Sequence, residues 1–497
     1  MAAKPQPAKK SYFFGKGYQD LYNTIKGAWA RNGESIGKYR ANLQGASTMG
    51  KAERLFVRVS NFLAIIAVAV CGSAITAVIS AVNVVILLTV MSVIYVGFTV
   101  VWLIDRLYLV RNRIFVACPE CKERSLIPTY ICPGCRERHT NLTPGVYGIL
   151  RRRCNCGYKL PTTFFNGRRN LEAECPACGH KLMDRESRPI CIPIVGGRSV
   201  GKTAFITAFS REFIENVAPT KGFEIEFYND EKARIYSEIT QDYIAGSTRM
   251  TERPQNIHAA SSVSFSFFVK SPAFTPERLV HVYDIAGEVF TDNRENEVQK
   301  QYEYCQGIVL IIDPFAIPSI RFKYEEQLGP EDIAGIGKAD INMVIDSFMN
   351  KLREVTGLSD RKMAAVPLAV VISKIDSADL KQEVGAAAVQ RLMEAEPERF
   401  TDFYDTQDYL CRRLLKDNGM ESVLNSICIR FRTNRFFACS AIGHARDKGA
   451  YAPTGVLPPM EWLFRLADSR MGQIWHDNDF SKKPPVLSAE DERDAQA

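Results

Sequence analysis

The stretch Gly196-Gly197-Arg198-Ser199-Val200-Gly201-Lys202-Thr203 decides the fold of this chain. It fits the pattern G-x-x-x-x-G-K-[ST], in which backbone N–H groups surround phosphates, the lysine reaches the β- and γ-phosphates and the threonine reaches Mg²⁺. An apolar run over 189–195 precedes the stretch, and an apolar helical pattern begins at 204. A strand, a glycine-rich loop and a helix in this order predict a phosphate-binding loop and not a chance glycine turn.

A second motif, Asp284-Ile285-Ala286-Gly287-Glu288, follows the strand-like run 278–283. An aspartate at the end of a strand beside a phosphate loop can hold Mg²⁺, usually through water. The backbone N–H of Gly287 would then meet the γ-phosphate. An isolated D-x-x-G turn is common, so this motif gains its meaning from its position after the phosphate loop.

Two further motifs follow apolar runs at 368–372 and 435–439. In Ser373-Lys374-Ile375-Asp376, the aspartate can accept two hydrogen bonds from guanine N1 and N2, a donor pair that adenine lacks. The lysine stem can cover the base. Ser440-Ala441 offers a backbone N–H to guanine O6. Together these motifs predict a site that selects guanine.

The four ordered motifs resemble those of the Ras-like GTPases of the translation-factor-related (TRAFAC) class, over roughly residues 189–475. The resemblance implies an α/β domain with a mostly parallel sheet, helical insertions and the ligand at the strand C-terminal ends. It implies GTP or GDP as ligand and Mg²⁺ on Thr203 and Asp284, with Lys202, Thr251 and Glu288 in the hydrolytic machinery. The implied nucleotide contacts are Gly196, Gly197, Arg198, Ser199, Val200, Gly201, Lys202, Thr203, Gly287, Ser373, Lys374, Asp376, Ser440 and Ala441.

Three features depart from the family pattern. Ser373 replaces the usual Asn or Thr, and Glu288 stands where many members carry the Gln that orients the attacking water. A carboxylate there is repelled by the triphosphate, so we expect slow hydrolysis or help from a partner. The segment between Lys202 and Asp284 is also long, which predicts an insertion that includes 223–228. The insertion leaves Thr248 and Thr251 as alternative switch threonines, and Arg249 and Arg253 as candidate arginine fingers.

A second informative region runs from Phe62 to Ile104 without a charged residue. This run is about twice the roughly 20 residues that one bilayer crossing needs. A polar break at 80–83 predicts a hairpin of two spans, near 62–81 and 84–104. Basic residues flank both ends, so both ends are expected in the cytoplasm, in the bacterial inner membrane. The basic, aromatic N-terminal segment either lies on an anionic leaflet or is a solvated tail.

Eight cysteines between 118 and 178 form four close pairs. Their proline- and glycine-containing turns predict two Cys₄ zinc ribbons, with His139 or His180 as substitute ligands. Taken in chain order, the first two pairs would make one ribbon and the last two the other. Disulfides are the competing interpretation, which a cytoplasmic location disfavours. The pairs are Cys118-x₂-Cys121, Cys132-x₂-Cys135, Cys154-x-Cys156 and Cys175-x₂-Cys178.

The expected organisation is a basic N-terminal segment (1–55), a transmembrane hairpin (56–112), a tandem zinc-ribbon module (113–187), a GTPase domain (188–475) and a polar tail (476–497). The net charge is +7. The ribbon thiolates cancel part of the local positive charge, so protein partners are favoured over nucleic acid. The combination looks like bacterial GTPases that work with a second GTPase. The prediction is a membrane-anchored GTPase switch, and the alternative is a non-hydrolysing membrane adaptor.

Overall fold

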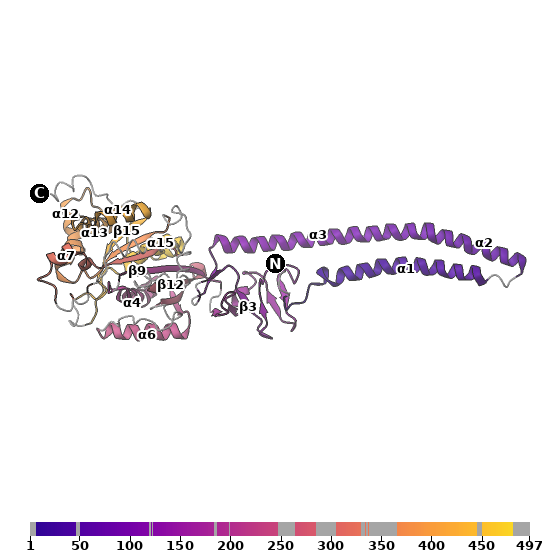
Figure 1. Ribbon diagram of the computed structural model, residues 1–497, viewed down its shortest axis with the longest axis horizontal. Coiled ribbons are helices and arrows are strands. Elements are labelled where there is room, and N and C mark those ends of the chain that lie inside the picture. Colours follow the sequence, from indigo (N-terminus) through magenta and orange to yellow (C-terminus); the bar gives the residue numbers. More distant parts are fainter. Residues whose placement is uncertain are drawn as a thin grey trace. The chain divides into compact units, whose positions relative to one another are not determined.

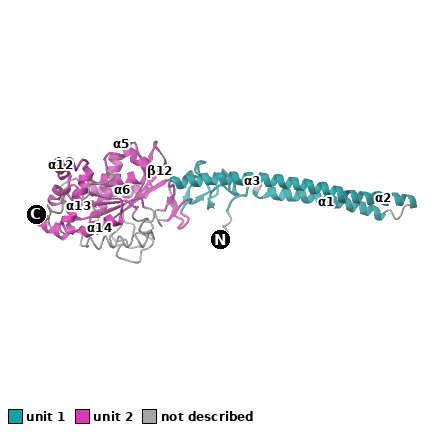
Figure 2. Ribbon diagram, turned by 90° about the horizontal axis from the view of Figure 1, so that it is seen from above, with its two compact units in different colours: residues 1–112, 127–174 teal, residues 113–126, 175–497 magenta. Residues whose placement is uncertain are grey.

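The computed structural model divides into two compact units, residues 1–112 with 127–174 and residues 113–126 with 175–497 (Figure 2). The residues that the structure describes are 6–45, 50–118, 121, 123–182, 186–197, 199–246, 264–284, 305–329, 333, 336, 365–444 and 450–480.

Long helices dominate the first unit (Figure 1). After the short helix η1 (Tyr12–Phe14), α1 (Lys16–Gly45) runs antiparallel beside α2 (Lys51–Ala67), the π-helical turn η3 (Val68–Gly72) and α3 (Ser73–Arg111). Asn32 on α1 donates a 2.7 Å hydrogen bond to Thr76 on α3. The ring of Phe14 lies 5.1 Å from that of Tyr95. The N-terminal segment is therefore a helix with a partner and not a solvated tail.

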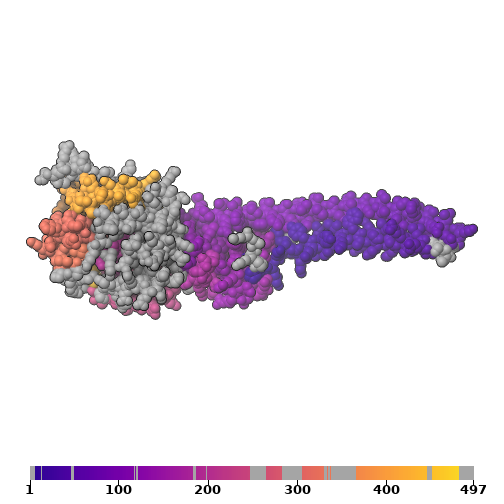
Figure 3. Space-filling model, in the orientation of Figure 1, coloured from indigo at the N-terminus to yellow at the C-terminus, as the bar shows by residue number. Residues whose placement is uncertain are grey.

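The predicted break at 80–83 is wrong, because Lys51–Arg111 forms one continuous helix of 61 residues. The Asn83 amide donates to the carbonyl of Ile79, 2.9 Å away, so the helix satisfies this polar side chain internally. No glycine or proline occurs between Ser73 and Val96 to interrupt the backbone hydrogen bonds. The two predicted helices are therefore one. Many apolar side chains of this helix are exposed. The helix is coloured indigo to purple in Figure 3.

A small cysteine-containing module completes the first unit. Asp105 of α3 and Arg168 are both fully buried and form an ion pair at 2.9 Å. Asp105 also accepts a hydrogen bond from the backbone N–H of Phe164 at 2.8 Å. These contacts attach the module to the end of α3. Its elements are β3 (Thr129–Ile131), β4 (Arg138–His139), β5 (Arg151–Arg153), β6 (Lys159–Pro161), η4 (Arg168–Asn170) and β7 (Ala173–Glu174).

The second unit is built on a seven-stranded sheet with the order β10-β11-β12-β9-β13-β14-β15. The pairs β10–β11 and β11–β12 are antiparallel, and every other neighbouring pair is parallel. The predicted α/β class with a mostly parallel sheet is confirmed. The strands are β9 (Arg188–Gly196), β10 (Glu224–Phe227), β11 (Ser264–Ser271), β12 (Phe274–Asp284), β13 (Ile308–Ile312), β14 (Leu368–Ile372) and β15 (Asn434–Ala438).

Helices cover both faces of this sheet (Figure 1). Alternate residues of β13 point to opposite sides, so Leu310 packs in one core and Ile311 in the other. The core that contains Leu310 is completed by α7 (Pro318–Lys323), α11 (Lys381–Val384), α13 (Phe403–Asp417) and α14 (Glu421–Arg430). The core that contains Ile311 is completed by α4 (Lys202–Glu212), η5 (Phe213–Val217), α5 (Ala218–Lys221), α6 (Asp230–Ile244), α15 (Leu457–Ala467) and α16 (Ser469–Ile474).

The remaining elements of the second unit are short, except α12. They are β1 (Val116–Ala117), β2 (Arg124–Ser125), β8 (Lys181–Leu182), η9 (Pro314–Ala316), η10 (Ala378–Leu380) and α12 (Ala386–Ala395). Phe115, just before β1, is buried in the same core as Leu310. The segment that leads into the first cysteine pair is thus part of the packing of the large sheet. The predicted insertion at 223–228 forms β10, an added edge strand, and α6 follows it.

Candidate nucleotide-binding site and cysteine clusters

The phosphate loop joins β9 to α4, as the sequence predicts. A Cβ atom on Gly196 would lie 2.7 Å from the carbonyl oxygen of Ile311 on β13, so only glycine fits there. Ser199 and Gly201 have φ angles of 62° and 93°, in the left-handed region. This turn sets the start of α4 directly after the loop. A helix N-terminus that follows such a loop favours anions.

The side chain of Lys202 packs against the phosphate loop. Its Nζ donates hydrogen bonds to the carbonyl oxygens of Gly196 at 3.1 Å and Gly197 at 2.7 Å. The side chain is buried. The loop carbonyls therefore hold the Lys202 ammonium close to the backbone groups that are expected to face phosphate. Arg198 lies outside the described residues.

The guanine motif is tied to the phosphate loop by Ser373. Its hydroxyl lies 2.9 Å from the carbonyl oxygen of Val200 and 3.1 Å from that of Ile312, and it shares its proton between them. Ser373 is buried, so these bonds form away from water. The serine that departs from the family pattern thus links two parts of the predicted site. The sequence indicated that a hydroxyl remains at this position but not which atoms it contacts.

Lys374 and Asp376 occupy the turn that follows β14. Lys374 has a φ of 55°, and its Nζ forms a 2.6 Å ion pair with the buried carboxylate of Asp313. Asp313 also caps η9 by accepting from the N–H of Phe315 at 3.0 Å. Asp376 is half-buried. Burial and the charge of Asp376 both raise the pKa of the Cys439 thiol, which places Asp376 beside the end of β15.

Asp313 is a residue that the motif search missed. It directly follows the buried run of β13, between the phosphate loop and the guanine motif in the sheet. An aspartate after a fully apolar strand was the available signal. Because its carboxylate fixes the Lys374 ammonium, the lysine stem is held across the turn that carries Asp376.

Ser440 and Ala441 follow β15 in a tightly bonded loop. The backbone N–H of Ser440 donates to Thr454 at 2.9 Å, and its hydroxyl accepts from the N–H of Gly443 at 2.7 Å. The Ser440 N–H is therefore engaged, whereas the N–H of Ala441 has no partner within the part of the chain that the structure describes. Gly443 has a φ of 90°, and a Cβ there would lie 1.9 Å from the carbonyl of Ala452.

The residues predicted to bind Mg²⁺ and to support hydrolysis are only partly placed. Asp284 ends β12, in register with Ile194 of β9, so its backbone reaches the same edge of the sheet as the phosphate loop. Thr203 is half-buried in the first turn of α4. The remaining predicted positions lie outside the described residues: Thr248, Arg249, Thr251, Arg253, Gly287 and Glu288.

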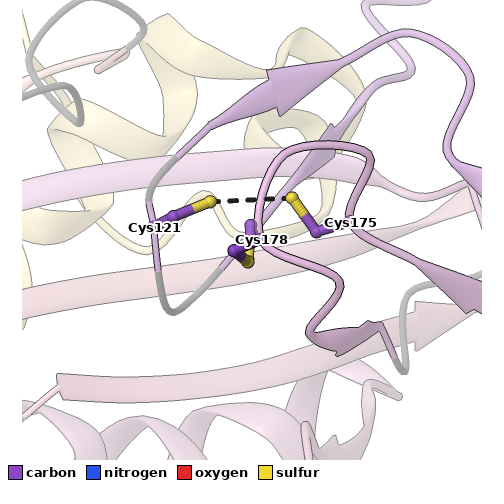
Figure 4. A group of neighbouring side chains, drawn as sticks. Cys121, Cys175 and Cys178 are labelled. Carbon is purple, nitrogen blue, oxygen red and sulfur yellow. Dashed lines mark hydrogen bonds between the residues drawn. The ribbon is translucent and has the colours of Figure 1, made fainter.

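The eight predicted cysteines gather into two tetrads that could hold metal ions, but their pairing is nested and not tandem. Cys118 and Cys121 meet Cys175 and Cys178, whereas Cys132 and Cys135 meet Cys154 and Cys156. The prediction that pairs follow chain order is therefore wrong. In the outer tetrad, the Sγ–Sγ distance is 3.7 Å for Cys118–Cys178. It is 3.6 Å for Cys121–Cys175, the pair joined by the dashed line in Figure 4.

The physical reason for the nesting lies in the strands between the pairs. β3 pairs with both β4 and β7, so the chain from Ile127 to Glu174 closes into its own module around the inner tetrad. The outer pairs flank that module in sequence and are left to meet each other. In the inner tetrad, Sγ–Sγ distances are 3.7 Å for Cys132–Cys156 and 3.5 Å for Cys135–Cys154. Four thiolates at about 2.3 Å from one zinc ion lie at such separations.

The substitute histidine ligands are not needed. His139 is fully buried, but neither ring nitrogen belongs to a tetrad or has a hydrogen-bond partner among the described residues. Burial and the charge of Arg152 lower the pKa of His139 to about 4. His180 instead accepts, through its carbonyl, a 2.9 Å hydrogen bond from the N–H of Cys175. That bond shapes the turn of the outer tetrad.

Comparison with known proteins agrees with this geometry. The family model described as Double-GTPase 2 matches residues 190–424, a segment that contains the phosphate loop and Ser373–Asp376 and ends before Ser440. No curated protein matches the chain.

Two solved structures of the S. cerevisiae Ski7 GTPase-like domain are similar to the chain, one bound to GTP and one to GDP and inorganic phosphate. Their sequence identities are 12% and 13%, with TM-scores of 0.27 and 0.26. In each case the match covers 59% of this chain and 51% of the other, so the chain spans about half the length of these structures. The sheet, the phosphate loop and the family match together identify residues 190–424 as similar to P-loop GTPases of the double-GTPase type.

Proposed function

We propose that this protein is a membrane-anchored GTP-binding switch that hydrolyses GTP slowly or with the help of a partner. The observation that carries the proposal is the hydrogen bond from Ser373 to Val200, at 2.9 Å. It joins the predicted guanine-reading turn to the predicted phosphate loop. A nucleotide held by one is then also held in position for the other.

Each residue has a defined role in this proposal. Lys202 exchanges its loop carbonyls for the β- and γ-phosphates, while Asp376 accepts from guanine N1 and N2. Thr203 and Asp284 would hold Mg²⁺, directly or through water, and the ion would neutralise phosphate charge. Gly287 would meet the γ-phosphate through its N–H, and Thr251 would complete the ion's surroundings. Loss of the γ-phosphate would release these segments.

Glu288 disfavours fast hydrolysis on chemical grounds. An ionised carboxylate near the γ-phosphate repels the triphosphate and orients water less well than an amide. This residue favours the alternative of a non-hydrolysing membrane adaptor that recruits proteins through its cysteine modules. The double-GTPase family description supports a second GTPase as the partner that supplies activity.

Two zinc ions are proposed for the two tetrads. Among the residues with described positions, each offers four cysteine sulfurs and no other donor, which is the ligand set of a closed structural zinc site. Burial raises the pKa of Cys154 to about 12, whereas a backbone hydrogen bond at Tyr158 lowers that of Cys156 to about 7. Zinc would displace the remaining protons. The proposed role is structural.

The membrane anchor is the helix from Lys51 to Arg111. Its apolar window has a mean hydropathy of 2.6 and is only 6% buried, unlike the core helix of a soluble domain. Valine, isoleucine and leucine side chains are exposed along α2 and α3. Burial of this surface in lipid removes it from water. We place the GTPase domain on the cytoplasmic side, where thiols remain available for zinc.

The test uses the full chain in lipid nanodiscs. Tight binding of GTP with turnover, alone or with a candidate partner GTPase, supports the switch. Tight binding with no turnover under any condition supports the adaptor instead. Base selection is tested by Asp376→Asn, which should shift preference from guanine to xanthine nucleotides. Asp379→Asn, an exposed change in the same loop, is the matched control. Unchanged preference in Asp376→Asn would contradict guanine recognition.

A further inference from the structure

Two buried tyrosines connect the inserted helix α6 to the loop that follows β15. The hydroxyl of Tyr243, in the last turn of α6, donates to the carbonyl oxygen of Ala441. In return, the hydroxyl of Tyr451 donates to the carbonyl oxygen of Gly246, just beyond α6, at 2.6 Å. The two rings contact each other edge to face, with centroids 4.8 Å apart. Both side chains are buried.

The contact from Tyr243 falls on the residue expected to read guanine O6. Ser440 N–H is engaged by Thr454, so Ala441 supplies the available backbone donor at this position. The hydroxyl of Ser440 also accepts a hydrogen bond from the N–H of Gly443. The carbonyl of Ala441, on the other side of the same Cα as the Ala441 N–H, accepts a hydrogen bond from Tyr243 and so holds the residue in place. Burial raises the pKa of Tyr243, so its hydroxyl stays protonated and remains a donor.

We propose that Tyr243 is a specificity-determining positioning residue that holds Ala441 N–H in place for guanine O6. The inference rests on the proposed guanine-binding function and adds a residue from the insertion to it. Because Tyr243 acts through Ala441, removal of its hydroxyl weakens the binding of nucleotides that carry O6. The affinity for nucleotides that lack O6 is unchanged. A purely structural role would weaken both kinds equally.

The experiment compares GDP with 6-thioguanosine diphosphate, which keeps the N1 and N2 donors for Asp376 and carries sulfur, a weak acceptor, in place of O6. Both are measured by competition against fluorescent GDP on the full chain in nanodiscs. Unaltered protein should prefer GDP. Tyr243→Phe keeps the ring contact with Tyr451 and should reduce that preference about five- to tenfold, which lies within the range of one net hydrogen bond.

Two variants serve as controls. Tyr236→Phe lies two turns earlier on α6, where its ring packs on Phe227 and Phe265, and it should leave the preference unchanged. Tyr451→Phe frees Gly246 but keeps Ala441 held, so it should change the preference less than about twofold.

Equal weakening of both nucleotides by Tyr243→Phe, or no weakening of either, overturns the inference while the proposed function stands. Failure of the unaltered protein to bind any guanine nucleotide overturns the proposed function and this inference with it. Selective loss of the O6-dependent preference supports both.

Discussion

The hydroxyl of Ser373 lies 2.9 Å from the carbonyl oxygen of Val200, so the turn after β14 is bonded directly to the phosphate loop. Both residues are buried, and the bond spans 173 positions of sequence. It joins the turn predicted to bind the base to the loop predicted to bind phosphate.

Removal of this bond should speed nucleotide release. Ser373→Ala leaves the Val200 carbonyl without its donor, at a cost of about 1 kcal/mol, so the dissociation rate of fluorescent GDP should rise about fivefold. Ser373→Asn restores the family residue and should retain slow release. Ser377→Ala, in the same turn, is the control and should match the unaltered protein. Equal rates in Ser373→Ala and the control would show that the bond does not matter for binding.

The two cysteine tetrads should differ in what they support. Cys175→Ser disrupts the outer tetrad, whose neighbouring segment buries Phe115 in the core of the large sheet. It should lower the melting temperature of the GTPase unit and weaken GDP binding. Cys154→Ser disrupts the inner tetrad, which belongs to the unit without the phosphate loop, and should leave GDP affinity within about twofold because distant sites act independently.

Zinc content measured by mass spectrometry should fall from two ions per chain to one in either cysteine variant. Cys71→Ser, on the exposed face of the long helix, should retain both ions. Equal loss of GDP binding in the inner and outer variants would contradict the separation of roles.

The buried carboxylate of Asp468 should make the GTPase unit sensitive to acid. Burial alone raises the pKa of Asp468, but the hydrogen bond and charge of Arg278, 2.7 Å away, and the charge of Arg188 outweigh it and lower the pKa. Because the pKa of Asp468 is lower in the folded state, its ionised carboxylate stabilises the fold at pH values above the ordinary pKa of a carboxyl group. That stability is lost as the pH falls through the folded-state value.

Asp468→Asn leaves Arg278 buried without its charge partner and should cost about 3 kcal/mol of unfolding free energy at neutral pH. The cost should shrink in acid, where the original carboxyl is itself protonated. Denaturant unfolding at several pH values measures both effects. Asp417→Asn removes an exposed 3.6 Å pair with Arg413 and should cost less than about 1 kcal/mol. A pH-independent cost for Asp468→Asn would refute the linkage.

Charges placed on the exposed face of α3 should prevent membrane insertion without damage to the fold. Val85 and Leu88 are 61% and 58% exposed, so arginine at both positions disturbs little protein packing. In lipid each arginine costs about 2.5–3.5 kcal/mol. The double variant should leave the carbonate-resistant membrane fraction, whereas Asn23→Arg on the exposed face of α1 should remain in it. Unchanged fractionation of the double variant would argue against lipid contact at this face.

Local chemistry allowed the strands of the sheet and the phosphate-loop turn to be predicted from sequence. The run 368–372 is observed as β14 with the same bounds, because five consecutive apolar residues before a polar turn form a fully buried parallel strand. Gly196 and Gly201 were recognisable for a similar reason, since the loop backbone cannot accept a side chain at 196 or an ordinary φ at 201.

The features that escaped prediction depend on contacts between distant residues. The cysteine spacing specifies turns that suit zinc, but it does not specify which two turns share one ion. The pairing of β3 with β7 determines which cysteine pairs come together. The sequence shows that Asn83 is polar, which suggested a break in the helix. It does not show that the Asn83 amide donates a hydrogen bond to the carbonyl of Ile79 within the same helix. Likewise, nothing in the local sequence around Tyr243 indicates that its hydroxyl reaches Ala441, 198 positions away.

The nested pairing brings together cysteines that lie far apart in the chain. With zinc bound, Cys121 and Cys175 are clamped to the same ion, although a whole module lies between them in the chain. Tension along the backbone on either side of that module would pass across zinc–sulfur bonds and bypass the module itself. A protease cut inside 127–174 would therefore leave the two fragments attached to each other, and a chelator would be needed to part them.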